Sequence, residues 1–332
     1  MAIEDNSATT DGVDKVTVRQ PPQGKFRNFL NFLYDKKNGT VLGRTGRSWF
    51  EITAFYIIFY SCLAGFFAIN MAIFLHTLDP LKPRYYGKGT IIGINPGMGY
   101  QPWIDTEPES TLIKFSRDDY KTYEKYVKQL DKFLKKYEYT DEDLQKTRDC
   151  RLGGNNTETD KKPCQFLANE TLKQAGCSKE KDYGFADGQP CILLTLNKLI
   201  DWEPVSYSLG SAPVEVQGRY DVDKGDVAVA CEGEYIADQE NIGKLEYYPP
   251  SGIDRKYFPY RVVDGYRQAF AIVKFATPPK GILVEVECKA YSLNIIHDRT
   301  NRLGMVHFEV LVEPTKEERE KGEKRAKTGE SN

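Results

Sequence analysis

An uncharged apolar run at residues 52–75 constrains this chain more than any other feature of its sequence. The run holds 24 residues without Asp, Glu, Lys or Arg, and about 20 apolar residues are enough for a helix to cross a bilayer. A secretory signal peptide has an apolar core of only about 7–15 residues, closer to the N-terminus. The run therefore predicts an uncleaved signal-anchor with a transmembrane helix at residues 51–76, rather than a buried helix of a soluble protein.

Three features on the two sides of the span predict its orientation. Basic residues are more frequent before the span than just after it, and cytoplasmic flanks carry the excess of Lys and Arg. Six of the seven cysteines follow the span, which is typical of disulfides in an oxidising compartment. The glycosylation sequons at Asn155 and Asn169 lie on the same side. We therefore expect a type II membrane protein with a cytoplasmic N-terminus.

Composition divides the rest of the chain. Residues 1–50 are polar and then basic, which predicts a cytoplasmic N-terminal tail. Residues 77–115 are rich in Gly and Pro and predict an extended extracellular stalk. Residues 116–313 contain the cysteines and predict a disulfide-stapled ectodomain, and the charged residues 314–332 predict a disordered tail. The net charge of -2 gives no field that would attract nucleic acid, so no nucleic-acid partner is expected.

Two periodicities predict the secondary structure of the ectodomain. Apolar residues recur at spacings of three and four between Tyr120 and Tyr137, which predicts an amphipathic helix with Ser116 and Asp119 as a capping arrangement. Alternating apolar residues in "CILLTLNKLI", "DVAVAC", "ILVEVECKAY" and "MVHFEVLVE" predict strands. Because strands and helices do not alternate repeatedly, the pattern predicts a mainly β ectodomain, an antiparallel sandwich with one added helix.

The six cysteines after the span allow fifteen disulfide pairings, and spacing alone cannot choose among them. Closing a loop of about 15 residues contributes roughly 3 kcal/mol in the chain-entropy model. Cys62 lies in the middle of the span, away from any oxidant, and is interpreted as a small packing residue. Local closure favours two bridges of 14 positions each and leaves a third between predicted strands: Cys150–Cys164, Cys177–Cys191 and Cys231–Cys288.

No motif in the sequence predicts catalysis. His76, His297 and His307 have no metal-ligand partner at a recognised spacing, and no zinc-protease, phosphate-loop or dinucleotide motif occurs. Asp221 and Asp223 have the DxD form of many type II glycosyltransferases, although a solvated turn explains them better. We therefore expect no catalytic residue, metal or cofactor. The span has no ionisable residue, so any ion that crosses a membrane here needs another subunit.

Six motifs carry a resemblance to a known family. In chain order they are "LGRTGRSWFEI", "FYIIFYSCLAG", "YGFADGQPCILLTLNKLIDWEP", "KLEYYP", "KYFPYR" and "VEVECKAYSLNI". Together with the cysteine spacing, they resemble the beta subunits of the sodium/potassium-transporting ATPase over about residues 25–312. The long stalk is most similar to that of invertebrate members. The beta subunit of the proton/potassium pump shares these motifs and remains an alternative.

The resemblance implies a fold, a location and a partner. It implies an immunoglobulin-like sandwich with an added helix, and it supports the three disulfides favoured by local closure. It also implies a non-catalytic subunit that assembles with a ten-span catalytic alpha subunit in the endoplasmic reticulum. Such a subunit stabilises the alpha subunit, allows its export to the plasma membrane and tunes potassium occlusion. A small single-span regulatory subunit is a further partner that the resemblance allows.

The resemblance also implies partner contacts at named positions. Aromatic residues of the span match those that pack on the seventh and tenth helices of the alpha subunit: Phe55, Tyr56, Phe59 and Tyr60. A second segment matches one that lies near an extracellular loop of the alpha subunit, with phenylalanine in place of one tyrosine: Tyr257, Phe258, Pro259 and Tyr260.

Small residues form a second stripe on the predicted span. At about 100° per residue, the tyrosines fall in one sector and Ser61, Gly65, Ala68 and Ala72 fall in another. Small residues at this spacing let two helices approach closely. We expect the tyrosine face to hold the alpha subunit. The face around Gly65 would then be free for a second helix or for close lipid contact.

Two other classes of function compete with a pump subunit. A stapled sandwich on a stalk also suits a cell-adhesion or junctional glycoprotein. A type II topology with a DxD motif suits a glycosyltransferase. Cell aggregation that persists without alpha contact would indicate the first alternative, and nucleotide-sugar binding would indicate the second.

Overall fold

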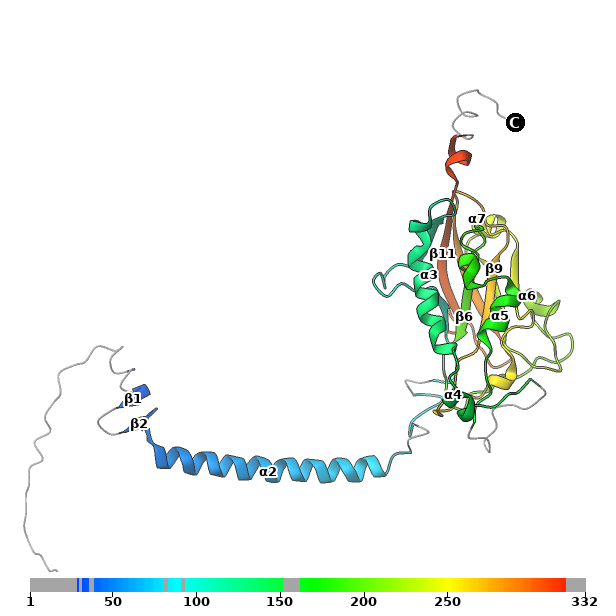
Figure 1. Cartoon of the computed structure of the whole chain (residues 1–332). Coiled ribbons are helices and arrows are strands. Elements are labelled where there is room, and N and C mark those ends of the chain that lie inside the picture. Colours follow the sequence, from blue (N-terminus) through cyan, green and yellow to red (C-terminus); the bar gives the residue numbers. More distant parts are fainter. Residues whose placement is uncertain are drawn as a thin grey trace, which may run out of the picture. The chain divides into compact units, whose positions relative to one another are not determined.

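The chain separates into two compact units, Met1–Leu78 and Asp79–Asn332. The first contains one long helix and a small sheet, and the second contains two larger sheets with shorter helices (Figure 1). The computed structural model describes residues 29, 32–35, 39–79, 83–90, 93–151 and 162–320.

One long helix, α2 (Gly46–His76), dominates the first unit. Thr45 caps its start, where the Thr45 hydroxyl accepts a hydrogen bond from the N–H of Ser48. No residue of α2 is buried, and within the described residues it is the one helix long and apolar enough to cross a membrane. The predicted single span is therefore confirmed, although the helix begins at Gly46 rather than at residue 51.

A small antiparallel sheet precedes α2 in the first unit. Its three strands are β1 (Tyr34–Asp35), β2 (Thr40–Val41) and β3 (Arg44–Thr45). The indole N–H of Trp49 donates to the carbonyl of Val41 at 2.8 Å and so attaches the first turn of α2 to this sheet. Sequence analysis did not predict the sheet, because strands of two residues are too short to show a period.

Two four-stranded sheets form the centre of the second unit, in the orders β5-β11-β10-β7 and β4-β6-β9-β8. They face each other through side chains such as Phe308, whose ring centre lies 4.9 Å from that of Tyr100 and 6.3 Å from that of Phe275. The predicted mainly β architecture is confirmed. The strands are β4 (Met98–Gln101), β5 (Leu112–Ser116), β6 (Cys191–Leu196), β7 (Ala228–Gly233), β8 (Leu245–Tyr248), β9 (Phe270–Phe275), β10 (Leu283–Tyr291) and β11 (Met305–Glu313).

One strand pair corrects the prediction of a wholly antiparallel sandwich. β5 and β11 are parallel, with Leu112 opposite Glu309 and Phe115 opposite Val312. A tight hairpin makes neighbouring strands antiparallel, but a long connection leaves their relative direction open. β5 and β11 come from opposite ends of this unit in the sequence, so the alternation within each strand could not reveal how they pair.

The predicted amphipathic helix is present as α3 (Tyr120–Leu134), followed by a 3-10 turn, η1 (Lys135–Tyr137). Asp119 caps α3 and accepts a hydrogen bond from the N–H of Lys121. The capping role predicted for Ser116 is wrong, because this residue is buried in β5. Tyr126 was missed as a core residue, and its ring stacks on that of Phe185 at 5.6 Å.

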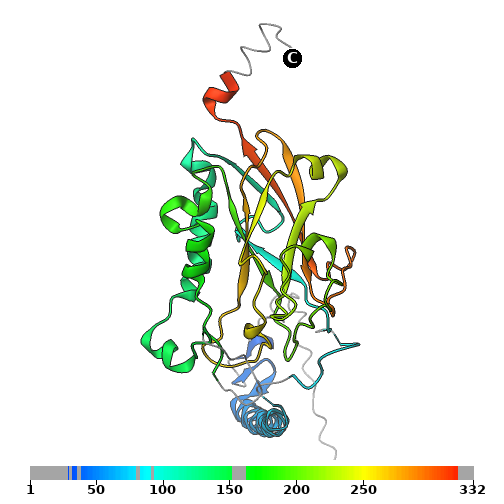
Figure 2. The ribbon, with the colours of Figure 1, turned by 90° about the vertical axis from the view of Figure 1, so that its right-hand side faces the viewer.

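Helices cover the outer face of the sheet β4-β6-β9-β8. Phe270 of β9 forms the centre of this contact, because its ring centre lies 5.3 Å from that of Tyr137 and 4.7 Å from that of Phe166. α5 (Ala168–Ala175) contacts β8 and β9, and α3 contacts β4 and β5 (Figures 1 and 2). The remaining short helices are α4 (Asp141–Lys146), η2 (Lys179–Gly184), α6 (Val214–Gln217), α7 (Ile236–Asn241) and η3 (Arg255–Tyr257).

The two ends of the second unit differ from the sequence prediction. Residues 77–115, predicted as a stalk, include β4 and most of β5, so the folded part begins near Met98. Gly and Pro around these strands hid their short alternation. Residues 316–320, predicted as disordered tail, are helical, because Thr315 and Glu318 cap each other through their side chains and backbone N–H groups. The rest of that predicted tail lies outside the described residues.

Candidate subunit interface and disulfide framework

Three disulfides staple the second unit, and they are the pairs that local closure favours. Cys231–Cys288 joins directly opposed residues of β7 and β10, with Cα atoms 4.0 Å apart. Cys177–Cys191 ties the segment after α5 to the first residue of β6, with Cα atoms 6.1 Å apart. Cys150–Cys164 joins two buried cysteines 14 positions apart, with Cα atoms 5.5 Å apart.

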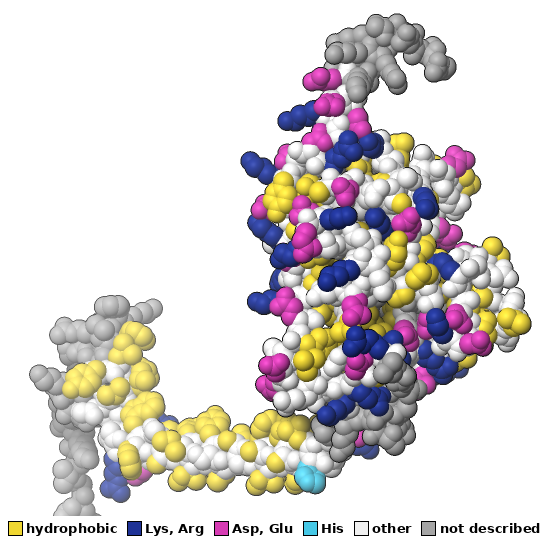
Figure 3. All heavy atoms as spheres, turned by 45° about the vertical axis from the view of Figure 1, so that its right-hand side comes forward, with side chains coloured by type: hydrophobic (Ala, Val, Ile, Leu, Met, Phe, Trp, Pro, Cys, Tyr) yellow, Lys and Arg dark blue, Asp and Glu magenta, His cyan; other side chains and the backbone are white. Residues whose placement is uncertain are grey.

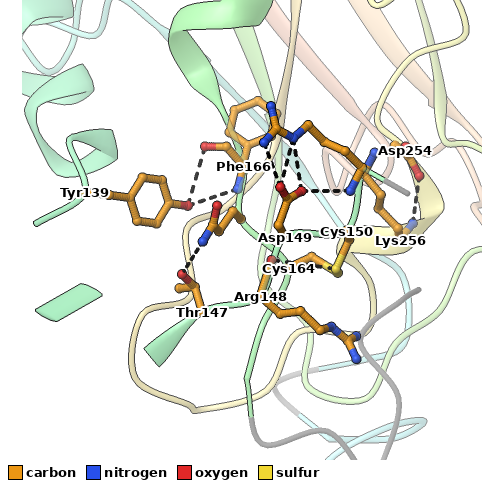
Figure 4. Close-up of a disulfide and its surroundings, with 11 residues drawn as sticks. Tyr139, Thr147, Arg148, Asp149, Cys150, Cys164, Phe166, Asp254 and Lys256 are labelled. Carbon is orange, nitrogen blue, oxygen red and sulfur yellow. Dashed lines mark hydrogen bonds and ion pairs between the residues drawn. A yellow bond between two sulfur atoms is a disulfide. The ribbon is translucent and has the colours of Figure 1, made fainter. Parts of the chain in front are cut away.

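Polar contacts support the Cys150–Cys164 bridge (Figure 4). The hydroxyl of Tyr139 accepts a hydrogen bond from the N–H of Phe166 at 3.0 Å. Next to the bridge, the carboxylate of Asp149 accepts hydrogen bonds from the guanidinium of Arg151, at 2.7 Å for the closest pair of atoms. These bonds, and one from the Arg151 backbone N–H, lower the pKa of Asp149 to about 2. The buried bridge thus lies beside an exposed, hydrogen-bonded ion pair.

Of the two predicted glycosylation sites, the structure describes Asn169. Asn169 is the second residue of α5 and is exposed to solvent. Thr171 of the same sequon is buried on the inner face of α5. Asn155 lies outside the described residues. Glycan attachment at both asparagines stays a prediction.

Four aromatic side chains of the span form a continuous ladder on α2. Phe55 stacks on Phe59 with ring centres 6.1 Å apart, and Tyr56 stacks on Tyr60 at 5.9 Å. Edge contacts at 5.5 and 5.4 Å join the two stacks. All four rings are exposed, and Figure 3 shows hydrophobic side chains along the length of this helix. The ladder therefore presents an aromatic surface that no described residue covers.

The small-residue stripe of α2 presents a different surface. A Cβ atom added at Gly65 would meet nothing within 4 Å apart from the neighbouring residues and the backbone of its own helix. Ser61, Ala68 and Ala72 are exposed as well. A flat, open strip of this kind leaves room for another backbone. The predicted division of the span into two faces is therefore present in the structure, while the partner of each face stays a prediction.

The second predicted contact segment begins at the last residue of η3 and precedes β9, and its four residues have different surroundings. The ring of Tyr257 packs edge-on against Phe166 at 5.3 Å, at the border of the core. The ring of Phe258 packs on Trp202 at 5.4 Å, so this position contributes packing rather than a hydroxyl. Pro259 is buried.

Tyr260 completes this segment and lies near the surface. Its ring centre lies 4.9 Å from that of Tyr266, and its carbonyl accepts a hydrogen bond from the N–H of Asp201 at 3.1 Å. The span ladder and this segment belong to different units, so the structure does not place them together. Sequence reasoning missed Trp202, although the "IDWEP" end of the quoted motif contains it.

An ion-pair cluster on the outer face of the other sheet was also missed. Ligand-type atoms of Glu234, Glu285 and His307 lie within 4.8 Å of one another. They come from the end of β7, from β10 and from β11, so spacing in the sequence could not reveal them. Arg299 forms an ion pair with Glu234 and a longer one with Glu287 at 3.8 Å. The arginine compensates the carboxylates, and we assign no metal to this cluster.

Taken together, one exposed apolar helix and a disulfide-bonded, mainly β unit define a single-span membrane protein with a large aqueous domain. A family model described as the sodium/potassium ATPase beta chain matches residues 19–308. The chain therefore belongs to the sodium/potassium ATPase beta chain family, as its motifs predicted. The immunoglobulin-like classification of its sandwich stays a prediction.

Three relatives illustrate the similarity. The chain is 49% identical over 292 residues to the probable sodium/potassium-transporting ATPase subunit beta-3 of Caenorhabditis briggsae, covering 87% of each chain. It is 34% identical to subunit beta-2 of Drosophila melanogaster, covering 91% of this chain and 97% of the relative. It is 28% identical to subunit beta-2 of Homo sapiens, covering 86% and 93%. The similarity thus extends over nearly the whole length of these relatives.

Proposed function

We propose that this chain is the non-catalytic beta subunit of a P-type sodium/potassium pump. In this role it binds the catalytic alpha subunit, supports its folding and its delivery to the plasma membrane, and tunes its potassium affinity. The observation that carries the proposal is the family match over residues 19–308, which includes α2 and the two sheets of the second unit except the end of β11. The names of the relatives, all sodium/potassium-transporting, favour this pump over the proton/potassium pump.

The aromatic ladder on α2 supports a membrane contact with the alpha subunit. Lipid tails are as apolar as leucine, so lipid alone gives no reason to place aromatic and small residues on separate faces. Four exposed rings in register offer a large and rigid contact area to a neighbouring helix.

The disulfides support a type II orientation. All three lie in the second unit, and such bridges persist in oxidising compartments. The exposed Asn169 sequon lies on the same side of α2 in the sequence. We therefore propose a cytoplasmic N-terminus and an extracellular second unit.

Surface delivery of the alpha subunit tests this function. The alpha subunit is expressed alone, with this chain, or with a control chain in which residues 52–75 are all leucine. The control keeps a membrane span but removes both faces. We expect the full chain to raise the amount of alpha subunit at the cell surface several-fold and the control to raise it little. If the chain reaches the surface by itself and leaves alpha delivery unchanged, the proposed function is wrong.

A further inference from the structure

A groove in the second unit has a predicted glycosylation site in its wall. Residues from the end of α3 and η1, from α5 and from η2 line this groove, and its volume is about 360 Å³. Asn169, the second residue of α5, is exposed and lines the groove. Leu172 and Lys173 line it too, because residues three and four positions apart share one face of a helix. A sugar attached to Asn169 therefore starts at this groove.

Contacts within the chain hold the walls of the groove. The Tyr183 hydroxyl of η2 donates a hydrogen bond to the carboxylate of Asp131 on α3 at 2.6 Å. The ammonium group of Lys179, also on η2, pairs with the same carboxylate at 2.9 Å. The Cys177–Cys191 bridge ties the segment between α5 and η2 to β6. The groove is therefore preformed, so a ligand that enters it loses little free energy in ordering the protein.

The charges around the groove cancel. Its lining contains three acidic and three basic residues: Asp131, Glu138, Glu180, Lys135, Lys173 and Lys179. A lining without net charge gives no electrostatic preference for a phosphate or another anion. Its carboxylates accept hydrogen bonds and its ammonium groups donate them, so both can pair with the hydroxyl and amide groups of a ligand. The lining therefore favours a neutral ligand that is rich in such groups.

The groove also offers apolar surface and a limited size. Leu134, Tyr137 and Leu172 line it, and the last two are buried. A sugar ring presents C–H groups on its faces and hydroxyl groups around its edge, so it matches a groove in which apolar side chains lie among polar ones. The volume is near the lower end of the range of about 300–1,000 Å³ for small-molecule sites. One or two sugar rings fit this volume, and a whole branched glycan does not.

We propose that Asn169 carries an N-linked glycan and that the first sugar residues of this glycan occupy the groove. In the attachment step, the side-chain nitrogen of Asn169 forms a bond to the anomeric carbon of an oligosaccharide carried on a lipid diphosphate. The bond between that carbon and the diphosphate breaks, the lipid diphosphate leaves, and the amide nitrogen gives up one proton. The sugars then join α3, α5 and η2 across the groove. The inference rests on the orientation proposed above, because the second unit must face an oxidising, lumenal compartment to be glycosylated.

Enzymatic removal of the glycan under native conditions is the first test. The full chain is produced in mammalian cells and purified in mild detergent. Mass spectrometry of its peptides then follows the rate at which a peptide-N-glycosidase frees Asn169. This enzyme cleaves the bond between the asparagine and the first sugar, so a docked sugar slows it. We expect removal from the native chain to be about tenfold slower than from the denatured chain.

Two exposed residues of the lining provide the groove variant. Glu138→Ala with Lys173→Ala removes one carboxylate and one ammonium group and leaves the net charge unchanged. We expect native removal of the glycan at Asn169 to become about fivefold faster, because hydrogen bonds to the sugar are lost. Glu124→Ala with Lys128→Ala is the matched control. It removes a surface pair of the same charges from α3 outside the groove, and removal should keep the wild-type rate.

Hydrogen exchange is the second test, and it leaves the other lining residues unchanged. Asn169→Gln removes the glycan. We expect the backbone amides of residues 168–184 to exchange about tenfold faster than in the wild type, since no sugar then links α5 to η2. Asn155→Gln removes the other predicted glycan and should leave this exchange unchanged.

The outcomes separate this inference from the proposed function. Equal removal rates for the wild type, the groove variant and its control, with unchanged exchange in Asn169→Gln, overturn the docking of the glycan. A chain glycosylated at Asn155 but not at Asn169 overturns the inference and leaves the proposed function intact. A chain with no glycan at either position overturns the proposed orientation as well. If the groove variant melts at a lower temperature than its control, the exchange of Asn169→Gln decides alone.

Discussion

The two units of this chain use apolar residues in opposite ways. In the second unit a large set of apolar side chains packs into one core, and Phe270, Phe308 and Val286 have no exposed surface. In the first unit α2 is equally apolar, yet none of its residues is buried. The core of the β unit is thus formed within the chain, whereas the apolar surface of α2 is left for lipid or for other helices. Substitutions on the faces of α2 should therefore change the binding of a partner. Substitutions in the β core should change the stability of the fold.

Truncating a core ring should cause the largest loss in the free energy of unfolding. Only substitutions in the β unit should cause such a loss. Phe308→Ala removes a fully buried ring between the two sheets, and we expect a loss of about 3–5 kcal/mol in the free energy of unfolding. Ile58→Ala, on exposed α2, should leave it unchanged. Urea unfolding of the full chain in detergent, followed by tryptophan fluorescence, measures both. Similar losses for the two variants would contradict the comparison.

Removing the Cys231–Cys288 bridge should cause the next largest loss of stability. The bridge closes a loop of 57 positions, which corresponds to about 4 kcal/mol in the chain-entropy model. We expect the double serine variant to become sensitive to trypsin in the second unit. Cys62→Ser in α2 is the control and should leave the protease resistance unchanged, because Cys62 is free and exposed.

Substitutions on the two faces of α2 should separate binding from stability. Tyr56→Ala with Tyr60→Ala removes one stack of the aromatic ladder, and we expect recovery of the alpha subunit to fall about tenfold, the equivalent of about 1.4 kcal/mol. Gly65→Leu fills the small-residue face and should lower recovery less. Quantitative immunoblotting of purified complexes gives the comparison. A larger loss for Gly65→Leu would reverse the assignment of the two faces.

The smallest effect should come from the exposed ion pair beside the Cys150–Cys164 bridge. Arg151 lowers the pKa of Asp149 to about 2. The stabilisation from the Asp149–Arg151 pair is therefore complete above about pH 4. It is lost as the pH falls through about 2, where the carboxylate is protonated in the folded state too. We expect a slight drop in melting temperature over this range that Asp149→Asn lacks. An unchanged pH dependence in that variant would contradict the role of the pair.

The sequence predicted the elements whose apolar residues recur at a regular spacing. It also predicted the span, whose minimum length is set by the thickness of a bilayer. The span followed from the absence of charge over residues 52–75. β10 followed from its alternation, and Val284, Val286, Cys288 and Ala290 are buried as expected. The apolar face of α3 was predicted correctly because its stripe is long, whereas its N-cap is Asp119 and not Ser116.

The missed features depend on contacts between distant segments. β4 is only four residues long and lies among Gly and Pro, so its two buried side chains, Met98 and Tyr100, gave too weak a pattern. The same limit applies to the candidate interface. The motif around Tyr260 indicated a contact segment, but only the fold brings Lys198 beside it.

The proposed function requires this chain to associate with a catalytic alpha subunit in the membrane. Isolation of the full chain from native membranes in mild detergent, followed by quantitative mass spectrometry, tests it most directly. We predict a catalytic sodium/potassium pump alpha subunit in an amount close to equimolar with this chain. Recovery of the chain without any P-type alpha subunit, from cells in which both are present, would contradict the account.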